Sequence, residues 1–305
     1  MPALPPSDDR HPEPQGRARG PRPLSEDEAR TSGSPGDDAY ARFAAYLERH
    51  VGITLGPSRA YLVDSRLAPV LAAYGLPDLA AAVEVLERRR DERLPAAIVD
   101  AMTTNETNWF RDGYAFRYLG EVLLGQLFAR RRPIRFWSAA CASGQEAYSI
   151  AMLVHEYLAA HPADDTTPVD IIATDVSGAI LRQAGAGIYD ALGGVRGLSP
   201  ERLRRYFERT AVGFELKAAI RKRVSFRAFN LLADPAFLGR FDVVFLRNVL
   251  IYFAAETRQR LLMRVRSRIA PGGHLVLGAS EAIPERELGF AMIKLPGGVV
   301  YQRSD

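Results

Sequence analysis

The stretch that most constrains the fold begins at Arg135 and ends at Tyr148, and it reads RFWSAACASGQEAY. Strand-forming residues lead into a run of small ones, and a polar pair then opens a run with helical character. This order predicts a strand, a tight turn and the start of a helix. Small residues let the backbone approach a ligand closely, and a helix start offers unpaired N–H groups. Such a turn commonly holds a nucleotide-like molecule at the carboxyl edge of a parallel sheet, although tight packing alone would select the same residues.

The chain from residue 133 onward alternates strand and helix patterns. Apolar, β-branched runs predict strands at 134–139, 169–175, 224–229, 241–246 and 274–277. Amphipathic runs predict helices at 146–158, 178–186 and 256–269, the last of them stopped by Pro271-Gly-Gly273. Residues 290–295 and 299–302 flank a Pro-Gly-Gly turn and predict an antiparallel hairpin. The pattern favours a doubly wound, Rossmann-like α/β sheet, and by fold analogy a closing hairpin is typical of methyltransferases rather than dehydrogenases.

Three other segments surround this sheet domain, which we place at 133–305. Residues 1–37 are rich in Pro, Gly and charged residues, so we expect a disordered tail. Residues 38–104 predict an all-helical domain, with helices over 38–52, 57–75, 77–86 and 94–102. Pro69 lies inside the second of these and predicts a kink or an early break. Residues 105–132 are expected to form an interdomain linker and helix that line a cleft.

The alternation lapses between Ile188 and Val224. Residues 198–207 predict a short helix with a Ser-Pro-Glu start, and residues 210–216 predict a hairpin about Gly213. We interpret about 190–224 as a small β-subdomain inserted into the sheet domain and facing a partner.

The composition of the chain argues against several classes of protein. The single cysteine, Cys141, excludes an internal disulfide framework, and the five histidines show no metal-ligand spacing, so we assign no metal. No apolar run approaches the ~18 residues of a membrane span, and we expect a cytoplasmic protein without membrane insertion. The net charge of +4 and the short arginine runs fit solvated helix faces, or attraction to a carboxylate-rich or phosphate-rich surface.

Polar residues gather where the predicted parallel strands end. Asp175 ends the second strand and could accept hydrogen bonds from a ribose, or cap the next helix. Glu146 opens the helix after the small-residue turn and could cap it or orient a cationic group. Arg247 and Asn248 follow the fourth predicted strand of the sheet, and Tyr252 comes one turn later. The carboxyl ends of parallel strands share one edge, so these side chains should converge on one crevice.

The segment TTNETNWFRD, residues 103–112, places polar side chains directly before two aromatic ones. A surface loop would not need the two aromatic residues. A core segment would not hold the polar side chains unless they had hydrogen-bond partners. We interpret the segment as lining a cleft. The alternative is a capped helix start anchored by Trp109 and Phe110 in the core.

Five motifs in this order resemble one known family. They are TTNETNWFR at 103–111, WSAACASGQE at 137–146, TD at 174–175, NLL at 230–232 and FLRNVLIYF at 245–253. From about Tyr40 to its C-terminus the chain is similar to the CheR family, the chemoreceptor glutamate methyltransferases that use S-adenosylmethionine. The resemblance implies a class I methyltransferase fold, S-adenosylhomocysteine as a product, and the glutamate-bearing helical domain of a chemoreceptor as the partner.

The resemblance also implies roles for particular residues. Contacts with the cofactor are expected from Asn105, Thr107, Arg111, Glu146, Asp175, Asn230, Leu231, Arg247 and Asn248. Arg111 and Tyr252 should lie nearest the methyl group and the incoming carboxylate. Arg59 and Arg66 are what remains of a richer basic face that family members present to the receptor. A glutamate with a pKa of ~4.3 is already ionised at neutral pH, so it needs alignment rather than a strong base.

Two features depart from the family pattern. Gln145 and Ala147 stand where members often have Glu and Pro, which should be tolerated. The segment after Phe207 is a few residues short for the hairpin by which some members hold a receptor's C-terminal peptide. Tethering through the β-subdomain is therefore doubtful.

Other functions fit the residues less well. An amino-group nucleic-acid methyltransferase usually has Asn-Pro-Pro-Tyr or Asp-Pro-Pro-Tyr where this chain has Arg247-Asn248-Val-Leu, and Cys141 does not follow a proline. We therefore expect no nucleic-acid partner. No Gly-x-Gly-x-x-Gly follows a strand, which disfavours a nicotinamide dehydrogenase. A non-catalytic module that binds S-adenosylmethionine or its product remains an alternative, against which the intact Arg111 and Tyr252 argue.

Overall fold

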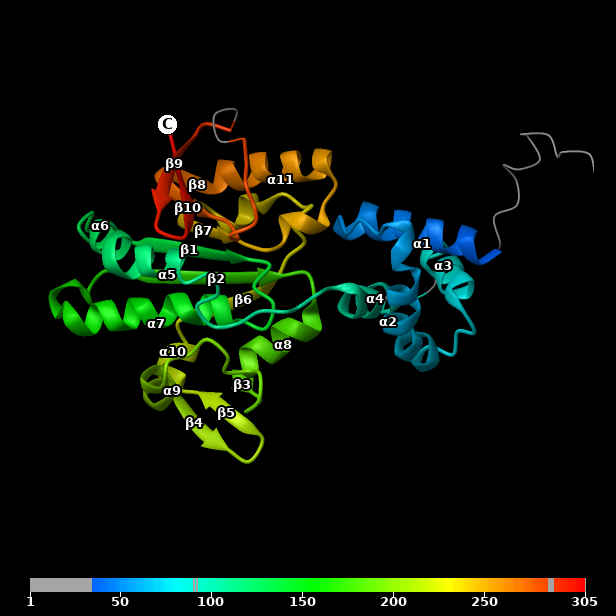
Figure 1. Cartoon of the computed structure of the whole chain (residues 1–305), viewed down its shortest axis with the longest axis horizontal. Coiled ribbons are helices and arrows are strands. Elements are labelled where there is room, and N and C mark those ends of the chain that lie inside the picture. The colour runs from blue at the N-terminus through cyan, green and yellow to red at the C-terminus, as the bar shows by residue number, and fades with distance from the viewer. Residues whose placement is uncertain (1–34, 90, 92, 285–287, 305) are drawn as a thin grey trace, which may run out of the picture.

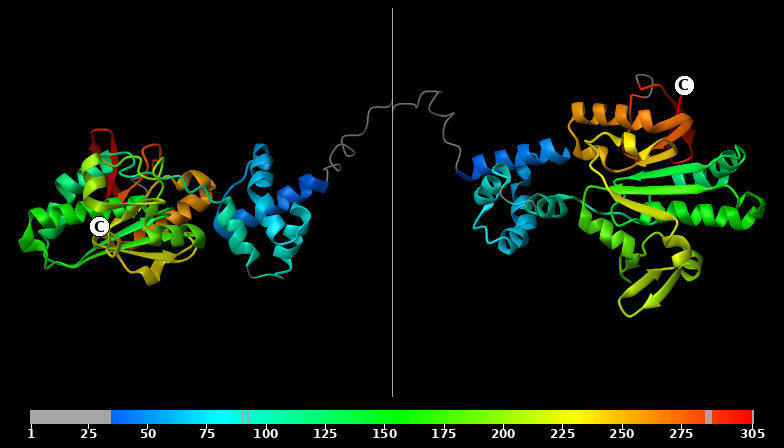
Figure 2. Two further views of the ribbon diagram at one scale, coloured as in Figure 1. Left: turned by 90° about the horizontal axis from the view of Figure 1, so that it is seen from below. Right: turned by 180° about the vertical axis from the view of Figure 1, so that it is seen from behind.

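The computed structural model describes residues 35–89, 91, 93–284 and 288–304. In Figure 1 a bundle of helices stands beside a larger part in which helices cover a central sheet. Figure 2 shows the same arrangement from two further sides. Residues 1–34 of the tail expected at 1–37 lie outside the described residues. Residues 35–37 instead form the first turn of a helix, which Pro35 and the acidic Asp37 and Asp38 favour at a helix N-terminus.

Helices whose apolar faces meet in one core build the N-terminal bundle. They are α1 Pro35–Val51, α2 Ala60–Ala73, α3 Leu79–Glu87 and α4 Leu94–Met102, with a 3-10 turn at Pro57–Arg59 ahead of α2. Phe43 and Leu47 of α1 contribute to the core at four-residue spacing, and Val63 and Leu67 of α2 do the same. Asp78 caps α3 by accepting a hydrogen bond from the backbone N–H of Ala81.

Pro69 does not end α2. The helix continues to Ala73, so the expected early break is wrong. A proline removes the N–H that would bond the carbonyl four residues earlier, here that of Ser65. Both residues lie on the exposed face, where water can hydrate that carbonyl. A glycine with a left-handed conformation follows each of the first two helices. The φ angle is +81° at Gly52, after α1, and +63° at Gly75, after α2.

The larger part is built on one mostly parallel sheet. Its strands are β1 Ile134–Ala139, β2 Val169–Asp175, β6 Val224–Ala228, β7 Phe241–Leu246, β8 Ile269–Val276, β9 Phe290–Leu295 and β10 Gly298–Arg303. They lie in the order β6-β2-β1-β7-β8-β10-β9, and β10 runs antiparallel to both β8 and β9. The class I methyltransferase fold and its closing hairpin are thus as predicted. From β1 the chain adds β2 and β6 on one side and β7 and β8 on the other, so the strand order reverses between β1 and β7. An open α/β sheet has its ligand crevice at such a point.

Alternate residues of each strand feed two separate cores, one on each face of the sheet. Phe136 and Phe245 pack toward the face covered by α7 Gln145–Ala160. Trp137 and Val244 point to the opposite face, which α11 Ala255–Arg268 covers. The helix α8 Gly178–Ala186 follows β2. The two-residue period of a strand therefore fixes which side chains meet which helices.

The segment after residues 105–111 is helical and packs into the core of the α7 face. It comprises α5 Tyr114–Tyr118, a π-helical turn at Leu119–Leu123 and α6 Leu124–Phe128. Its apolar side chains, such as Phe116 and Phe128, fix the chain between the bundle and β1.

The strand β8 begins five residues earlier than expected. Pro271-Gly-Gly273 lies inside it instead of ahead of it, so the expected boundary is wrong. The pairing with β7 shifts register between Phe241 and Val243, which accommodates the extra residues as a bulge. A Cβ at Gly273 would lie 2.8 Å from the carbonyl oxygens of Ala270 and Asp242, so this close approach requires glycine.

The inserted subdomain contains a second small sheet of order β3-β5-β4. Its elements are β3 Ile188–Tyr189, α9 Pro200–Tyr206, β4 Phe207–Thr210, β5 Gly213–Leu216 and α10 Ala218–Arg221. The hairpin starts at Phe207 and turns at 211–212, so its expected start at residue 210 and its turn about Gly213 are wrong. Further 3-10 turns lie at Pro162–Asp164, Pro235–Leu238 and Leu250–Tyr252. Among the described residues, no helix combines the length and apolarity of a membrane span.

Candidate functional site

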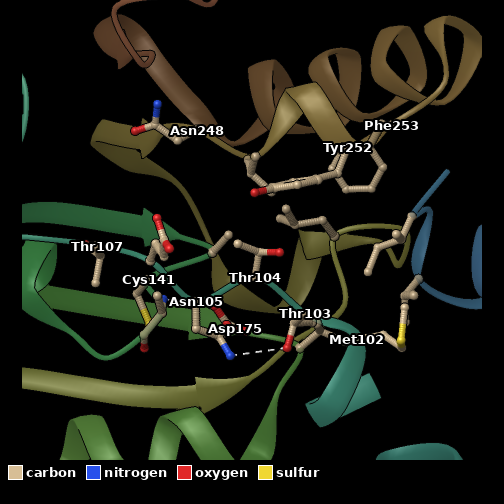
Figure 3. A pocket seen from close by; sticks show the side chains of 18 of the residues that line it. Met102, Thr103, Thr104, Asn105, Thr107, Cys141, Asp175, Asn248, Tyr252 and Phe253 are labelled. Carbon is tan, nitrogen blue, oxygen red and sulfur yellow. Dashed lines mark hydrogen bonds between the residues drawn. The ribbon is translucent and has the colours of Figure 1, made fainter. Parts of the chain in front are cut away.

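One cavity lies between the helical bundle and the carboxyl edge of the sheet. Its walls come from the C-terminal end of α1 and the segment after it, the first half of α2, residues 102–107 with Arg111, and the loops after β1, β2, β6 and β7. All the residues named from the sequence line it: Arg59, Arg66, Asn105, Thr107, Arg111, Glu146, Asp175, Asn230, Leu231, Arg247, Asn248 and Tyr252. In Figure 3 Tyr252 lies across the cavity from Asp175 and Asn105.

The turn after β1 presents its backbone to the cavity. Ala140 and Ala142 adopt left-handed conformations, with φ of +60° and +48°, which L residues with a side chain rarely do. The N–H of Cys141 is bonded to the carbonyl oxygen of Thr174 at 2.9 Å, which ties this turn to the end of β2. Such strain at a ligand crevice is typical of a functional site.

Asp175 fastens the two loops at the bottom of the cavity. Its carboxylate accepts hydrogen bonds from the backbone N–H groups of Ala142 at 2.9 Å and Ser177 at 3.0 Å. Burial raises the pKa of Asp175, and the backbone hydrogen bonds oppose part of that rise. The capping alternative is wrong, because Ser177 is the residue that caps α8, through the N–H of Ile180.

A buried ionic network lies beside the turn. Arg247 donates to Glu146 at 2.8 Å and to Asp112 at 2.9 Å, and it also bonds the carbonyl oxygen of Arg111. The second carboxylate oxygen of Glu146 accepts from the hydroxyl of Ser138 at 2.7 Å. Burial opposes the charge of Arg247, but the two carboxylates outweigh it and the pKa of Arg247 is raised. Glu146 therefore does not cap α7; it belongs to this network.

The polar segment before α5 lines the cavity as expected, whereas the alternative of a capped helix start is wrong, because α5 begins at Tyr114 without a capping side chain. Its first part lines the cavity, where the amide of Asn105 donates to the hydroxyl of Thr103 at 3.3 Å, as Figure 3 shows. Arg111 donates to the carbonyl oxygen of Glu106 at 3.1 Å. Trp109 is instead buried in the core and donates to the carbonyl oxygen of Gly194 at 2.7 Å. The aromatic residue anchors the polar stretch that the cavity uses.

Two side chains around the cavity bond the helical bundle, Asn230 from the sheet domain and Arg66 from within the bundle. The amide of Asn230 donates to the carbonyl oxygen of His50 at 2.6 Å. The guanidinium of Arg66 donates to the carbonyl oxygen of Met102 at 2.9 Å, at the C-terminus of α4, where a cation is favoured. Asn230 uses one amide N–H on His50 and its amide oxygen on the N–H of Leu232, which reduces the hydrogen-bonding capacity left for a ligand.

Glu281 is a site residue that the sequence reasoning missed. It is 7% exposed, and its carboxylate accepts three backbone hydrogen bonds, from Asn248 at 2.7 Å, Leu250 at 2.9 Å and Gly278 at 2.9 Å. These bonds hold Asn248 in a left-handed conformation with φ of +56°. The signal that could have indicated it is an acidic residue in the loop after β8, at the carboxyl edge of the sheet.

Comparison with known proteins identifies one family. The SAM binding domain of CheR methyltransferases matches residues 105–299, and the all-alpha domain of CheR methyltransferases matches residues 38–103. Chemotaxis protein methyltransferase 1 of Pseudomonas aeruginosa is 45% identical over 266 residues, which cover 86% of this chain and 97% of that protein. Chemotaxis protein methyltransferase Cher2 of Pseudomonas putida is 44% identical over 273 residues, covering 88% and 99%. A chemotaxis protein methyltransferase of Vibrio anguillarum is 44% identical over 267 residues, covering 87% and 97%.

Proposed function

Because this chain belongs to the CheR family of S-adenosylmethionine-dependent chemotaxis methyltransferases, we propose that it methylates glutamate side chains of a chemoreceptor. The products would be a glutamate methyl ester and S-adenosylhomocysteine, and the reaction would take place on the cytoplasmic helical domain of the receptor. The observation that carries the proposal is the composition of the single cavity described above. Its lining includes the buried carboxylates of Glu146 and Asp175, here called the acidic side, and the side chains of Arg59, Arg66, Arg111 and Tyr252, here called the basic side.

The acidic side has hydrogen-bonding capacity left for the cofactor. A carboxylate offers about four acceptor positions, and Asp175 uses two of them on backbone N–H groups. The remaining positions suit the hydroxyls of a ribose. Glu146 likewise has capacity beyond its bonds to Ser138 and Arg247, which suits the ammonium group of a methionine moiety. The bound cofactor supplies an activated methyl group on a positively charged sulfur.

The remaining contacts follow from position around the same cavity. Asn105 and Thr107 would bind the cofactor from the interdomain segment, and Asn230 and Leu231 would flank the adenine. Arg247 would act mainly by holding Glu146, because its two terminal nitrogens are already engaged. Asn248 would complete the pocket.

The basic side would receive the substrate carboxylate. Arg111 donates one N–H to the carbonyl oxygen of Glu106, and its planar guanidinium has further N–H donors. With the hydroxyl of Tyr252 it would align a glutamate for direct displacement, and that alignment can lower a barrier by several kcal/mol. Arg59 and Arg66 would add attraction for the acidic receptor at the rim. No general base is required, because the glutamate is ionised at neutral pH.

The test uses the full chain, cofactor labelled in its methyl group, and the cytoplasmic fragment of a candidate receptor. We expect base-labile label on glutamates of the fragment, and none when those glutamates are replaced by glutamine. Arg111→Ala should lower the rate at least tenfold without a matching loss of folded protein, whereas Arg117→Ala, an exposed arginine outside the cavity, should behave as wild type. Label that is stable to base, or full activity of Arg111→Ala, would count against the proposal.

A further inference from the structure

The turn that carries Tyr252 is held from two directions. On the sheet side, Glu281 bonds the backbone N–H groups of Asn248 and Leu250. On the bundle side, the N–H of Thr54 donates to the carbonyl oxygen of Tyr252 at 2.9 Å. This backbone bond joins residues almost two hundred positions apart and connects the helical bundle directly to the catalytic candidate.

Gly52 brings the bundle into unusually close contact with the same turn. A Cβ at this position would lie 2.3 Å and 2.5 Å from two ring carbons of Phe253, the neighbour of Tyr252. It would also lie 3.2 Å from a methyl carbon of Leu232. Phe253 is 6% exposed and belongs to the core under α11, so its ring has little room to move away. Only a residue without a side chain permits this contact.

The contact lies at the cavity wall. Figure 3 shows Phe253 beside Tyr252, and the blue ribbon of the N-terminal bundle passes on the side of Phe253. Ile53, between the two contacting residues, itself lines the cavity. A displacement of residues 52–54 would therefore be passed to Tyr252 through Phe253 and through the Thr54 hydrogen bond.

We propose that Gly52 and Thr54 are positioning residues for methyl transfer, which fix Tyr252 against the cavity from the helical bundle. The inference rests on the role proposed above for Tyr252. It makes the bundle part of the catalytic geometry as well as a surface for the receptor. Misplacement of a reacting group by about 1 Å can cost on the order of a hundredfold in rate. The bond through Thr54 uses its backbone, so Gly52 is the position where substitution is informative.

The experiment compares Gly52→Ala with Gly75→Ala. Both glycines follow a helix of the bundle with positive φ, but a Cβ at Gly75 would meet nothing within 4 Å. The backbone penalty is thus similar, and the two variants differ mainly in the contacts with Phe253 and Leu232. We expect Gly52→Ala to lower kcat on the receptor fragment at least about tenfold relative to Gly75→Ala, while the Kd for adenosylhomocysteine changes by less than about threefold. Phe253→Leu, introduced into Gly52→Ala, should restore part of kcat by making room.

A second measurement separates this inference from the proposed function. Amide hydrogen exchange of residues 249–254, recorded without any receptor, should accelerate in Gly52→Ala and stay at the wild-type rate in Gly75→Ala. That result would support the contact even if the substrate proved not to be glutamate. Equal exchange in the two variants would overturn the inference, and so would a kcat loss equal to that of Gly75→Ala. A change confined to the Kd for adenosylhomocysteine would also overturn it.

Discussion

The carboxylate of Glu281 accepts a hydrogen bond from the backbone N–H of Asn248 at 2.7 Å, across 33 positions of sequence. The same side chain bonds Leu250 and Gly278, so one buried acid holds the whole start of the turn that leads to Tyr252. Hydrogen bonds to an ionised acceptor are about twice as strong as neutral ones, so this anchor resists displacement of the turn.

Glu281→Ala should therefore lower both stability and methyl transfer. Three backbone N–H groups would lose their acceptor, at a cost of roughly 1–3 kcal/mol for a buried unsatisfied group. Glu281→Gln keeps one acceptor oxygen and should recover part of kcat. Steady-state kinetics and urea denaturation of the two variants test this. Identical kcat values for the alanine and glutamine variants would remove the anchoring role.

Arg247→Met should strongly destabilise the cofactor-free protein. The substitution leaves Glu146 and Asp112 without their common cation, and breaking a buried pair in this way costs about 3–5 kcal/mol. Adding Glu146→Gln should recover part of the loss, because it removes one uncompensated charge. Arg42→Ala breaks the exposed ion pair with Glu87 and serves as the control, with a change close to experimental error. A loss no larger than in that control would contradict the buried network.

The affinity for adenosylhomocysteine should fall on acidification because of Asp175. Burial raises the pKa of this carboxyl, so it gains a proton at higher pH than an ordinary aspartate and then accepts ribose hydrogen bonds less well. Below the unfolded pKa of ~3.9 the group favours folding, and that contribution is lost as pH rises through the folded pKa. Calorimetric titration from neutral pH to the acid limit of folding should show the loss of affinity. Asp175→Asn should bind weakly with a flatter pH profile; an unchanged profile would exclude Asp175 as the titrating group.

His274 should make the protein less stable in mild acid. The ring is 1% exposed, and neither nitrogen has a hydrogen-bond partner among the described residues. Burial and, to a smaller extent, the charge of Arg130 lower the pKa of His274 from 6.5 to about 4, and Asp242 opposes part of that shift. The unfolded chain therefore binds a proton that the folded chain does not, and stability falls as pH drops from 6.5 toward 4, by at most about 3 kcal/mol.

The measurement for His274 is the free energy of unfolding across this pH range. His274→Leu should lose less stability than wild type on acidification. His161→Gln, at an exposed position, should follow the wild-type curve. Parallel curves for wild type and His274→Leu would show that another group titrates.

Local sequence pattern was enough for most of the elements. The predicted limits of 94–102, 134–139, 169–175, 178–186 and 241–246 agree with the structure at both ends. In these segments the apolar residues recur with one clear period and a residue that ends the element follows, so interactions between neighbouring residues determine their limits. The errors fall where position in the folded molecule overrides a local signal. The carbonyl left without a partner by Pro69 faces water, and Gly273 is packed within a bulge.

The sequence by itself determined the sheet and its crevice, because apolar periodicity and the ends of parallel strands depend on neighbouring positions. The motifs that it shares with the CheR family indicated most of the residues that reach the crevice. Only the tertiary structure decided which of these residues bond one another. Arg247 meets Glu146 across 101 positions, and Gly52 meets Phe253 across the boundary between bundle and sheet domain. Such pairings depend on how whole elements pack, since a hydrogen bond or a steric contact is set within tenths of an ångström and no short stretch of sequence specifies it.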